Sequence, residues 1–206
     1  SLELQNAHII RSRLAFEALV ILLGREKGVV SSDYYFEDKL SVFEIARRIS
    51  KGEHHLAPIA VTIPEGFDTL QIADTFASKL ANFNKNKFLL EAAELEGSLF
   101  PDTYFFLRTD TETDVIKSML SNFEKKMLAL KPTIALSQKT KKEIVIMASL
   151  IEGEAKGSAD REVISGILWR RLDIGMLLQV DVALETYKTK GLPKNPINNP
   201  GLAAIR

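Results

Sequence analysis

Two carboxylates, Glu152 and Glu154, directly follow residues 144–151, a run of eight uncharged and mostly apolar side chains. The run is shorter than the about 20 residues that a membrane-spanning helix needs, and its alanine, methionine and leucine residues favour helix over strand. On a helix, Glu152 shares a face with Ala148 and Ser149, so its carboxyl group lies at the edge of an apolar surface. Partial burial disfavours the charged form of a carboxyl group, so Glu152 could stay protonated near neutral pH, as a general acid must.

The same local pattern leaves a second interpretation open. Glu152 and Glu154 could be ordinary solvated residues at a helix end, with Lys141, Lys142 or Lys156 as loose partners. Most patterned carboxylates are structural, so the local pattern alone favours this interpretation. Periodicity does not separate the two glutamates from each other.

Composition restricts the class of protein. The 206 residues are 46% hydrophobic, which is enough for a core in one large domain or two small ones. The 27 lysines and arginines balance the 27 aspartates and glutamates, so no net field attracts nucleic acid or an anionic membrane surface. With no cysteine, disulfides, thiol catalysis and cysteine metal sites are excluded. Adjacent His54 and His55 are expected in a solvated turn, and no metal or other cofactor is expected.

The ends of the sequence suggest an excised piece of a longer protein. The chain begins SLELQN without a methionine and stops shortly after a Pro-Gly turn. No signal peptide or transmembrane segment is evident in it.

Residues 1–29 are predicted to form an N-terminal helical segment. Its helix spans residues 12–24 and ends in a glycine. The expected inward face consists of Leu14, Ala15, Ala18, Leu19 and Leu22.

Two strand-helix units follow in tandem and are predicted to form one module over residues 30–80. The first combines an aromatic strand at 33–36 with a helix at 42–50, and the second combines a strand at 59–63 with a helix capped by Asp68. The two helices match in cap and apolar positions, and one unit cannot bury its apolar face alone, so the units should pack together. The second, GFDTLQIADTF, resembles the signature of LysM domains, which bind glycan chains.

Residues 81–206 are predicted to combine helices with turn-rich segments. Residues 96–106, EGSLFPDTYFF, should form a rigid aromatic loop that either covers the core or forms a wall of a sugar site. Residues 176–181 should be extended, with Gln179 and Asp181 on one side. Helices are expected at 87–95, 114–130, 137–151 and 159–173, the last with Val163, Ile164, Ile167, Leu168 and Leu172 facing inward.

Three sequence blocks together resemble one protein family. EGSLFPDTYFF, then ASLIEGEAK with REVISGILWRRLDIGMLLQVD, and finally TYKTKGLPKNPINNPGLAAI are similar, in this order, to the YceG-like endolytic murein transglycosylases (MltG). The blocks cover most of the chain after Glu96, and the tandem units stand where that family carries a LysM-like subdomain. The prediction is therefore an α+β fold, with a small LysM-like module of two strand-helix units followed by a mixed α/β catalytic domain at 81–206.

The resemblance implies a lytic transglycosylase that cuts nascent peptidoglycan strands internally, between N-acetylmuramic acid and N-acetylglucosamine. Such an enzyme uses no water and leaves a 1,6-anhydromuramoyl end. The family's catalytic motif, Ser-Ile-Val-Glu-x-Glu, falls on residues 149–154 and makes Glu152 the general acid and base. One carboxylate suffices, because the sugar's own C6 hydroxyl replaces the attacking water. The residues expected to shape the substrate site are Glu96, Asp102, Tyr104, Glu154, Arg171, Gln179 and Asp181.

The chain departs from the family pattern after Asp181. Only residues 182–186 separate Asp181 from Tyr187, where the family carries a long segment. Either the active-site flap is shortened or residues are missing from this sequence. Val182 and Ala183 also replace the usual proline or alanine and threonine, and Arg170 replaces an asparagine.

Two further functions stay open. The protein could be a non-catalytic peptidoglycan-binding or scaffold protein of the cell-wall synthesis machinery, or a hydrolase that uses Glu152 with Asp181 or Glu154 as its second carboxylate. The resemblance also implies peptidoglycan synthases as partners. It implies a location on the cell-wall side of the cytoplasmic membrane, held by an N-terminal anchor that this chain does not contain.

Overall fold

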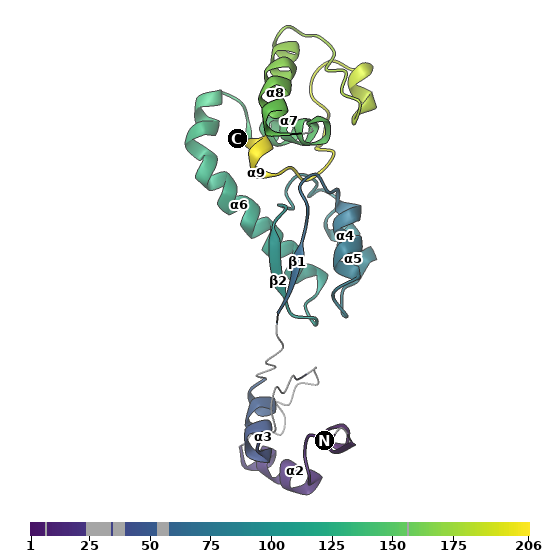
Figure 1. Ribbon diagram of the computed structural model, residues 1–206, viewed down its shortest axis with the longest axis vertical. Coiled ribbons are helices and arrows are strands. Elements are labelled where there is room, and N and C mark those ends of the chain that lie inside the picture. Colours follow the sequence, from purple (N-terminus) through teal and green to yellow (C-terminus); the bar gives the residue numbers. More distant parts are fainter. Residues whose placement is uncertain (7, 24–33, 35–39, 53–57, 156) are drawn as a thin grey trace. The chain divides into compact units, whose positions relative to one another are not determined.

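The computed structural model describes residues 1–206 except 7, 24–33, 35–39, 53–57 and 156. The chain divides into two compact units, Ser1–Ile59 and Ala60–Arg206 (Figure 1). We call them unit 1 and unit 2 and describe each by itself. No helix in the described part of the chain is long and apolar enough to cross a bilayer.

Unit 1 is a small helical assembly of α1 (Leu2–Asn6), α2 (Arg13–Leu22) and α3 (Val42–Lys51). Ser12 caps α2 and Ser41 caps α3, each by accepting a backbone N–H at the start of its helix. The buried core joins both helices and consists of Ile10, Phe16, Val20, Ile45, Ala46 and Ile49.

The predicted inward face of α2 is wrong except for Leu19, which packs partly buried against the core. Leu14 and Leu22 are 79% and 80% exposed, whereas Phe16 and Val20 are buried. The sequence of this helix is apolar almost all round, so its pattern does not select a face, and packing against α3 does.

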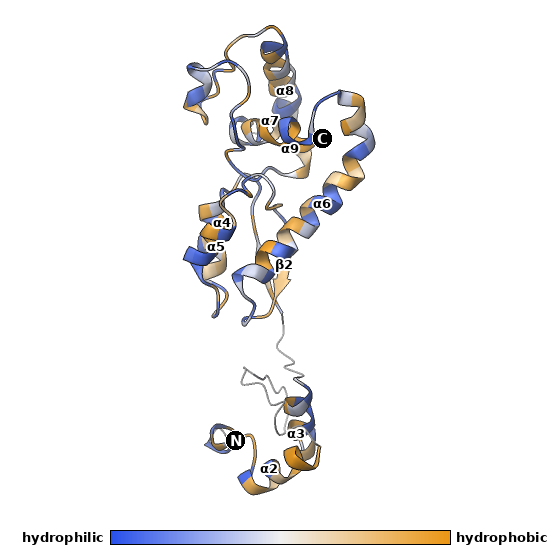
Figure 2. Ribbon diagram, turned by 180° about the vertical axis from the view of Figure 1, so that it is seen from behind, coloured by the Kyte–Doolittle hydropathy of each residue, from blue (hydrophilic) through white to orange (hydrophobic). Residues whose placement is uncertain are grey.

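Unit 2 begins with a two-stranded antiparallel sheet between helices. β1 (Ile59–Thr62) pairs with β2 (Thr103–Phe106), in a register that puts the Thr62 and Thr103 hydroxyls 2.8 Å apart. The Ile63 N–H donates to the Asp102 carbonyl one step further along. The accompanying helices are α4 (Thr69–Ala77), α5 (Lys85–Glu91) and α6 (Glu112–Ser137). Figure 2 shows polar and apolar residues mixed along α6, whose buried side chains include Met119, Phe123 and Met127.

The division between the two units falls inside the module predicted over residues 30–80. The buried face of α3 packs on α2, whereas β1 pairs with β2, which lies some forty residues further along the chain. The helix predicted at 42–50 forms as expected. So do the strand predicted at 59–63 and the helix capped by Asp68. Apart from Tyr34, the strand predicted at 33–36 lies outside the described residues. The structure confirms an α+β fold with one small sheet. It does not confirm a LysM-like module.

The second half of unit 2 is built around α7 (Lys141–Glu154). It packs against α8 (Ser158–Asp173) and the short α9 (Leu202–Ile205), and the 3₁₀ helix η2 (Leu184–Tyr187) follows α8 (Figure 1). A capping box between Thr140 and Glu143 starts α7. The buried cluster here comprises Met147, Leu150, Ile151, Leu168, Leu178, Val180 and Ala183.

Two helix predictions need correction. The helix predicted to end at residue 130 continues through Pro132 to Ser137, where Gln138 takes a left-handed conformation. On α8, Leu168 is buried as predicted, but Val163 and Ile167 are 63% and 48% exposed. The α8 sequence distributes apolar residues widely, and contact with α7 buries only part of them.

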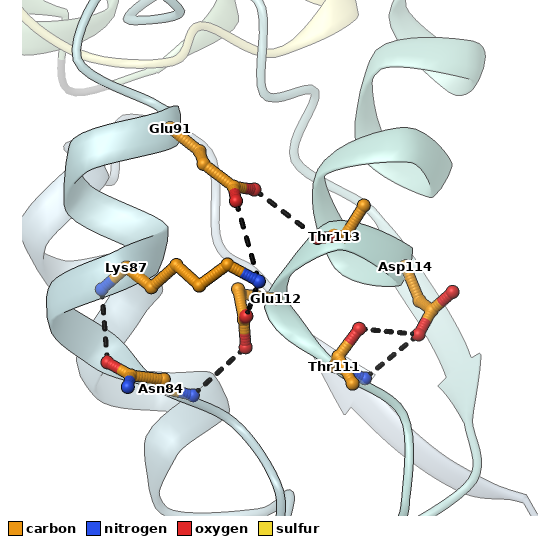
Figure 3. A network of polar contacts seen from close by, with 7 residues as sticks. All are labelled: Asn84, Lys87, Glu91, Thr111, Glu112, Thr113 and Asp114. Atoms are coloured by element: carbon orange, nitrogen blue, oxygen red, sulfur yellow. Dashed lines mark hydrogen bonds and ion pairs between the residues drawn. The ribbon is translucent and has the colours of Figure 1, made fainter.

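A polar network joins α5 to α6 (Figure 3). Glu112 is only 4% exposed, and its carboxylate accepts hydrogen bonds from the Lys87 Nζ at 2.6 Å and the Asn84 N–H at 3.1 Å. Lys87 also lies 3.6 Å from a Glu91 carboxylate oxygen. The hydrogen bond from Lys87 lowers the pKa of Glu112 below its usual range.

Replacing Glu112 with glutamine is expected to make the stability of unit 2 less dependent on pH in acid. Because the folded pKa is lowered, the charged form of Glu112 stabilises the fold above its ordinary pKa of 4.5. That contribution disappears as the pH falls through the lowered value. Urea unfolding followed by the fluorescence of Trp169, the single tryptophan, should show a stability deficit for Glu112→Gln at pH 7 that narrows toward pH 3. A deficit that does not change with pH would contradict the role assigned to this carboxylate.

Candidate active site

Glu152 lies in the last turn of α7, and its side chain is only 6% exposed. Both carboxylate oxygens have partners. Oε1 accepts a hydrogen bond from Arg161 Nη2 at 2.7 Å, and Oε2 accepts one from the Gly201 N–H at 3.0 Å. The burial expected from the sequence is present. The surroundings are not simply apolar, because a guanidinium group contacts the carboxylate.

A second carboxylate reaches the same guanidinium. Glu65, in the turn between β1 and α4, places Oε2 3.6 Å from Arg161 Nη2. Next to it, Gly66 has φ +80°, and a Cβ there would lie 3.4 Å from Glu152 Cγ. Gly201 approaches Glu65 even more closely, since a Cβ on Gly201 would lie 1.9 Å from Glu65 Oε1. The turn and the C-terminal loop therefore converge on Glu152.

The loop that carries Gly201 is fastened to α7. Ser149 is fully buried, and its hydroxyl oxygen accepts the Ile197 N–H at 3.2 Å. The Ser149 carbonyl accepts a hydrogen bond from Asn198 Nδ2 at 3.0 Å. These contacts, one turn before Glu152, fix the path of the loop and bring the Gly201 N–H to the Glu152 carboxylate.

Asn199 connects three segments of unit 2 and is fully buried. Its Oδ1 accepts the Leu99 N–H at 2.8 Å, while its Nδ2 donates to the Phe67 carbonyl at 3.1 Å and to Glu96 Oε1 at 2.6 Å. The Asn199 carbonyl accepts the Gly66 N–H at 2.9 Å. This one side chain and its backbone hold the turn beside Glu152 in place.

Glu96, predicted to shape the substrate site, belongs to this network. Its second carboxylate oxygen accepts the Thr69 N–H at 3.0 Å, at the start of α4. Burial raises the pKa of Glu96 above its usual range. The contacts of Glu96 are therefore with the framework of the site, and no contact with Glu152 is found among the described residues.

Four other predicted residues hold or belong to the segment after α8. Glu154 Oε1 accepts the Val182 N–H at 3.1 Å, and Arg171 Nη1 donates to the Leu178 carbonyl at 2.6 Å. Asp181 accepts a short hydrogen bond from the Tyr187 hydroxyl. The fourth residue, Gln179, is exposed and has φ +54°.

This segment forms no strand in the described structure. Even so, Leu178 and Val180 are buried while Gln179 and Asp181 are exposed, which is the alternation predicted. Residues 182–186 connect Asp181 to Tyr187 directly, partly as η2.

Asp102 and Tyr104 line a different hollow, of about 670 Å³, between β2 and α6. Asn122 Nδ2 donates to Asp102 at 3.0 Å and to the Tyr104 hydroxyl oxygen at 3.1 Å, and the Tyr104 hydroxyl donates to the Phe100 carbonyl. The hydrogen bond from Asn122 lowers the pKa of Asp102, and burial raises that of Tyr104 to about 12. No contact in the described structure joins this pair to Glu152.

A cleft of about 850 Å³ reaches the neighbours of Glu152, although Glu152 itself does not line it. Arg161 and Glu65 form part of its wall, so both charged partners of the site face the space that a ligand could fill. The complete lining is Glu65, Ile151, Arg161, Glu162, Ser165, Gly166, Leu202, Ala203, Ala204 and Arg206.

Sequence reasoning missed Arg161, Glu65, Gly201 and Asn199. A signal existed for Arg161, because a cation in the first turn of a helix opposes the helix dipole and needs another reason to be there. Glu65 lies in the turn between β1 and α4, where no local pattern distinguishes it. Nothing local distinguishes Asn199 from its neighbours in a turn-rich segment.

Comparison with known proteins shows the family of this chain. Residues 1–206, the whole chain, match the model of the YceG-like family. The chain belongs to the YceG-like family. An endolytic murein transglycosylase of Bacillus subtilis is 26% identical over 250 residues, covering 98% of this chain and 69% of that protein. One of Streptococcus pneumoniae strain D39 is 27% identical over 235 residues, covering 84% of this chain.

This YceG-like chain is shorter than its relatives. It spans 43% of the length of the Streptococcus pneumoniae protein. The alignment with the Bacillus subtilis protein extends over 250 residues, more than the 206 residues of this chain. The Bacillus subtilis protein therefore has residues within the aligned region that this sequence lacks. A YceG-like protein of Listeria monocytogenes supports the fold, with a TM-score of 0.62 at 21% identity over 98% of this chain and 82% of that one.

Proposed function

We propose that this YceG-like chain cuts peptidoglycan glycan strands as an endolytic murein transglycosylase, with Glu152 as the general acid and then the general base. The single observation that carries the proposal is the position of Glu152. Its carboxyl group is almost fully buried, is held at both oxygens, and lies beside a cleft large enough for sugar residues. The names of the Bacillus subtilis and Streptococcus pneumoniae relatives supply the reaction class.

The proposed reaction needs one carboxyl group. Protonated Glu152 gives its proton to the glycosidic oxygen as the bond from C1 of the muramoyl residue breaks. The C6 hydroxyl oxygen of the same residue then bonds to C1, and its proton returns to the Glu152 carboxylate. No water is consumed, and the acid is regenerated. Because the attacking group belongs to the substrate, alignment of the sugar in the cleft replaces activation of a water molecule.

Gly201 has a positioning role in this proposal. Its N–H donates to Glu152 Oε2, so Oε1 is the oxygen that carries the proton. Arg161 must release Oε1 before this can happen. Exposed Gln179 and Asp181 remain proposed contacts for the sugar chain, and Glu154 is proposed to keep their segment in place.

The masses of the products test the reaction. Purified glycan strands incubated with the protein should give fragments with 1,6-anhydromuramoyl ends, each lighter by one water than the corresponding reducing fragment. Reducing ends would indicate a hydrolase instead, and uncut strands that remain bound would indicate a binding protein.

Location and partners are proposed on the family resemblance. We infer action on the cell-wall side of the cytoplasmic membrane, next to peptidoglycan synthases. Fractionation of cells that express the full-length protein, followed by cross-linking, tests both statements. Recovery in the cytoplasmic fraction without any synthase would contradict them.

A further inference from the structure

Arg161 is shared between two carboxylates of the cleft. We propose that Glu65 is a positioning residue that takes the Arg161 guanidinium from Glu152 when a glycan strand binds, and so frees Glu152 to carry its proton. The inference rests on the proposed transglycosylase function and assigns a second carboxylate to the same site.

The geometry makes this exchange a short movement. The same nitrogen, Arg161 Nη2, lies 2.7 Å from Glu152 Oε1 and 3.6 Å from Glu65 Oε2. The guanidinium therefore bonds to Glu152 and needs only a small shift to bond to Glu65. Among the residues that the structure describes, no other acidic group approaches Arg161 this closely.

Arg161 also has an unused donor. Its Nε is buried and has no hydrogen-bond partner among the described residues. A buried donor without a partner is costly, and arginine binds carboxylates best through two parallel N–H groups. Movement onto Glu65 would let Nε donate as well, which offsets the loss of the bond to Glu152.

Exposure gives the movement a direction. The side chain of Glu152 is 6% exposed, that of Arg161 20% and that of Glu65 47%. Glu65 is thus nearest the solvent, and a guanidinium that moves toward it moves outward along the cleft wall. A sugar chain that enters the cleft covers Glu65 and strengthens its attraction for the cation, because the local dielectric falls.

The exchange matters because Arg161 Nη2 occupies Oε1, the Glu152 oxygen that the Gly201 N–H leaves free. While this contact lasts, Oε1 is not available to the glycosidic oxygen. Once the guanidinium has moved onto Glu65, Oε1 can face the substrate. The other charged groups nearby are Glu162 and Arg206, which line the same cleft, and Glu154 on α7, which bonds to Val182.

Glu65→Gln removes the acceptor and leaves the cation on Glu152. Oε1 should then stay occupied when the strand binds, so kcat should fall about tenfold, which is about 1.4 kcal/mol in the barrier, while KM changes little. Glu65→Asp, which keeps the charge on a shorter side chain, should recover part of the loss. The matched surface control is Glu124→Gln, since Glu124 is 68% exposed and pairs with Lys141 and with no other group among the described residues.

Gly201→Ala provides an independent variant that changes no charge. The added Cβ would meet Glu65 Oε1 at 1.9 Å and must displace that carboxylate. It should lower kcat with KM little changed, as Glu65→Gln does. Fluorescence of Trp169 and circular dichroism confirm that each variant is folded.

A readout without turnover separates this proposal from the proposed function. The ¹⁵N–¹H signal of Arg161 Nε, assigned by its absence in Arg161→Lys, should shift when purified glycan strands bind to the wild type, and should shift much less in Glu65→Gln. If wild-type protein produces no anhydro ends but the signal shifts on binding, the transglycosylase assignment fails and the shared arginine stands. A signal that does not change on binding, or that shifts equally in Glu65→Gln, overturns the role of Glu65.

Discussion

Glu152→Gln is expected to lower the rate of glycan-strand cleavage by about 100- to 10,000-fold, the usual loss when a general acid and base is removed. The glutamine amide has the size of the carboxyl group and can still accept the Gly201 N–H, but it cannot give a proton to the glycosidic oxygen. Burial of the side chain at 6% exposure leaves no room for water to replace it. Single-turnover cleavage of labelled strands measures the rate, and binding of uncut strands should persist.

Glu154→Gln is the matched control on the same helix. Glu154 accepts only the Val182 N–H among its described hydrogen bonds, and a glutamine oxygen can accept it equally. The control should therefore lose much less activity than Glu152→Gln. Comparable losses in the two variants, or wild-type turnover in Glu152→Gln, would show that Glu152 is not the proton donor.

Asn199→Asp should destabilise unit 2 by about 3–5 kcal/mol, the range for an uncompensated buried charge. Asn199 is fully buried, and its Nδ2 donates to the Glu96 carboxylate and to the Phe67 carbonyl. An aspartate at this position would place a carboxylate oxygen, which has no hydrogen to donate, against both acceptors. Urea unfolding at pH 8, followed by Trp169 fluorescence, measures the loss.

The deficit of Asn199→Asp should shrink as the pH falls. Burial already raises the pKa of Glu96, so one of two facing carboxyl groups readily takes a proton in acid and can then donate a hydrogen bond. The variant should accordingly be closer to the wild type at pH 5 than at pH 8. Asn195→Asp, at an exposed position of the same segment, should change stability by no more than about 0.5 kcal/mol. Equal effects at positions 195 and 199 would rule out the proposed network.

Features that depend on a few neighbouring residues were predictable from the sequence. The caps at Ser41 and Asp68 and the helix before Glu152 follow from local hydrogen bonds and periodicity, and the structure confirms them. The helix begins at Lys141 and extends to Glu154, where 137–151 was predicted, because contacts with α8 and with the segment after α8 support its last turn.

Features that depend on distant packing were not predictable. Residues 65, 161 and 201 meet at Glu152 only through the tertiary fold, and no spacing in the sequence relates them. The inward faces of α2 and α8 were predicted only in part for the same reason, since apolar residues surround both helices and only the neighbouring elements decide which side is buried. Likewise, the partners of Glu154 and Asp181 are backbone and tyrosine groups of one segment, and not Glu152.

The position of Asn199 has a consequence for how the protein is made. Its side chain joins Leu99 and Phe67, which precede it by 100 and 132 residues. Contacts over such distances close long loops and form late in folding. On the ribosome, β1, the Glu65 turn and α7 can be complete while Asn199 and Gly201 are still unsynthesised. The Glu152 carboxylate therefore acquires its full set of partners, Arg161 and the Gly201 N–H, only after Gly201 has emerged from the ribosome.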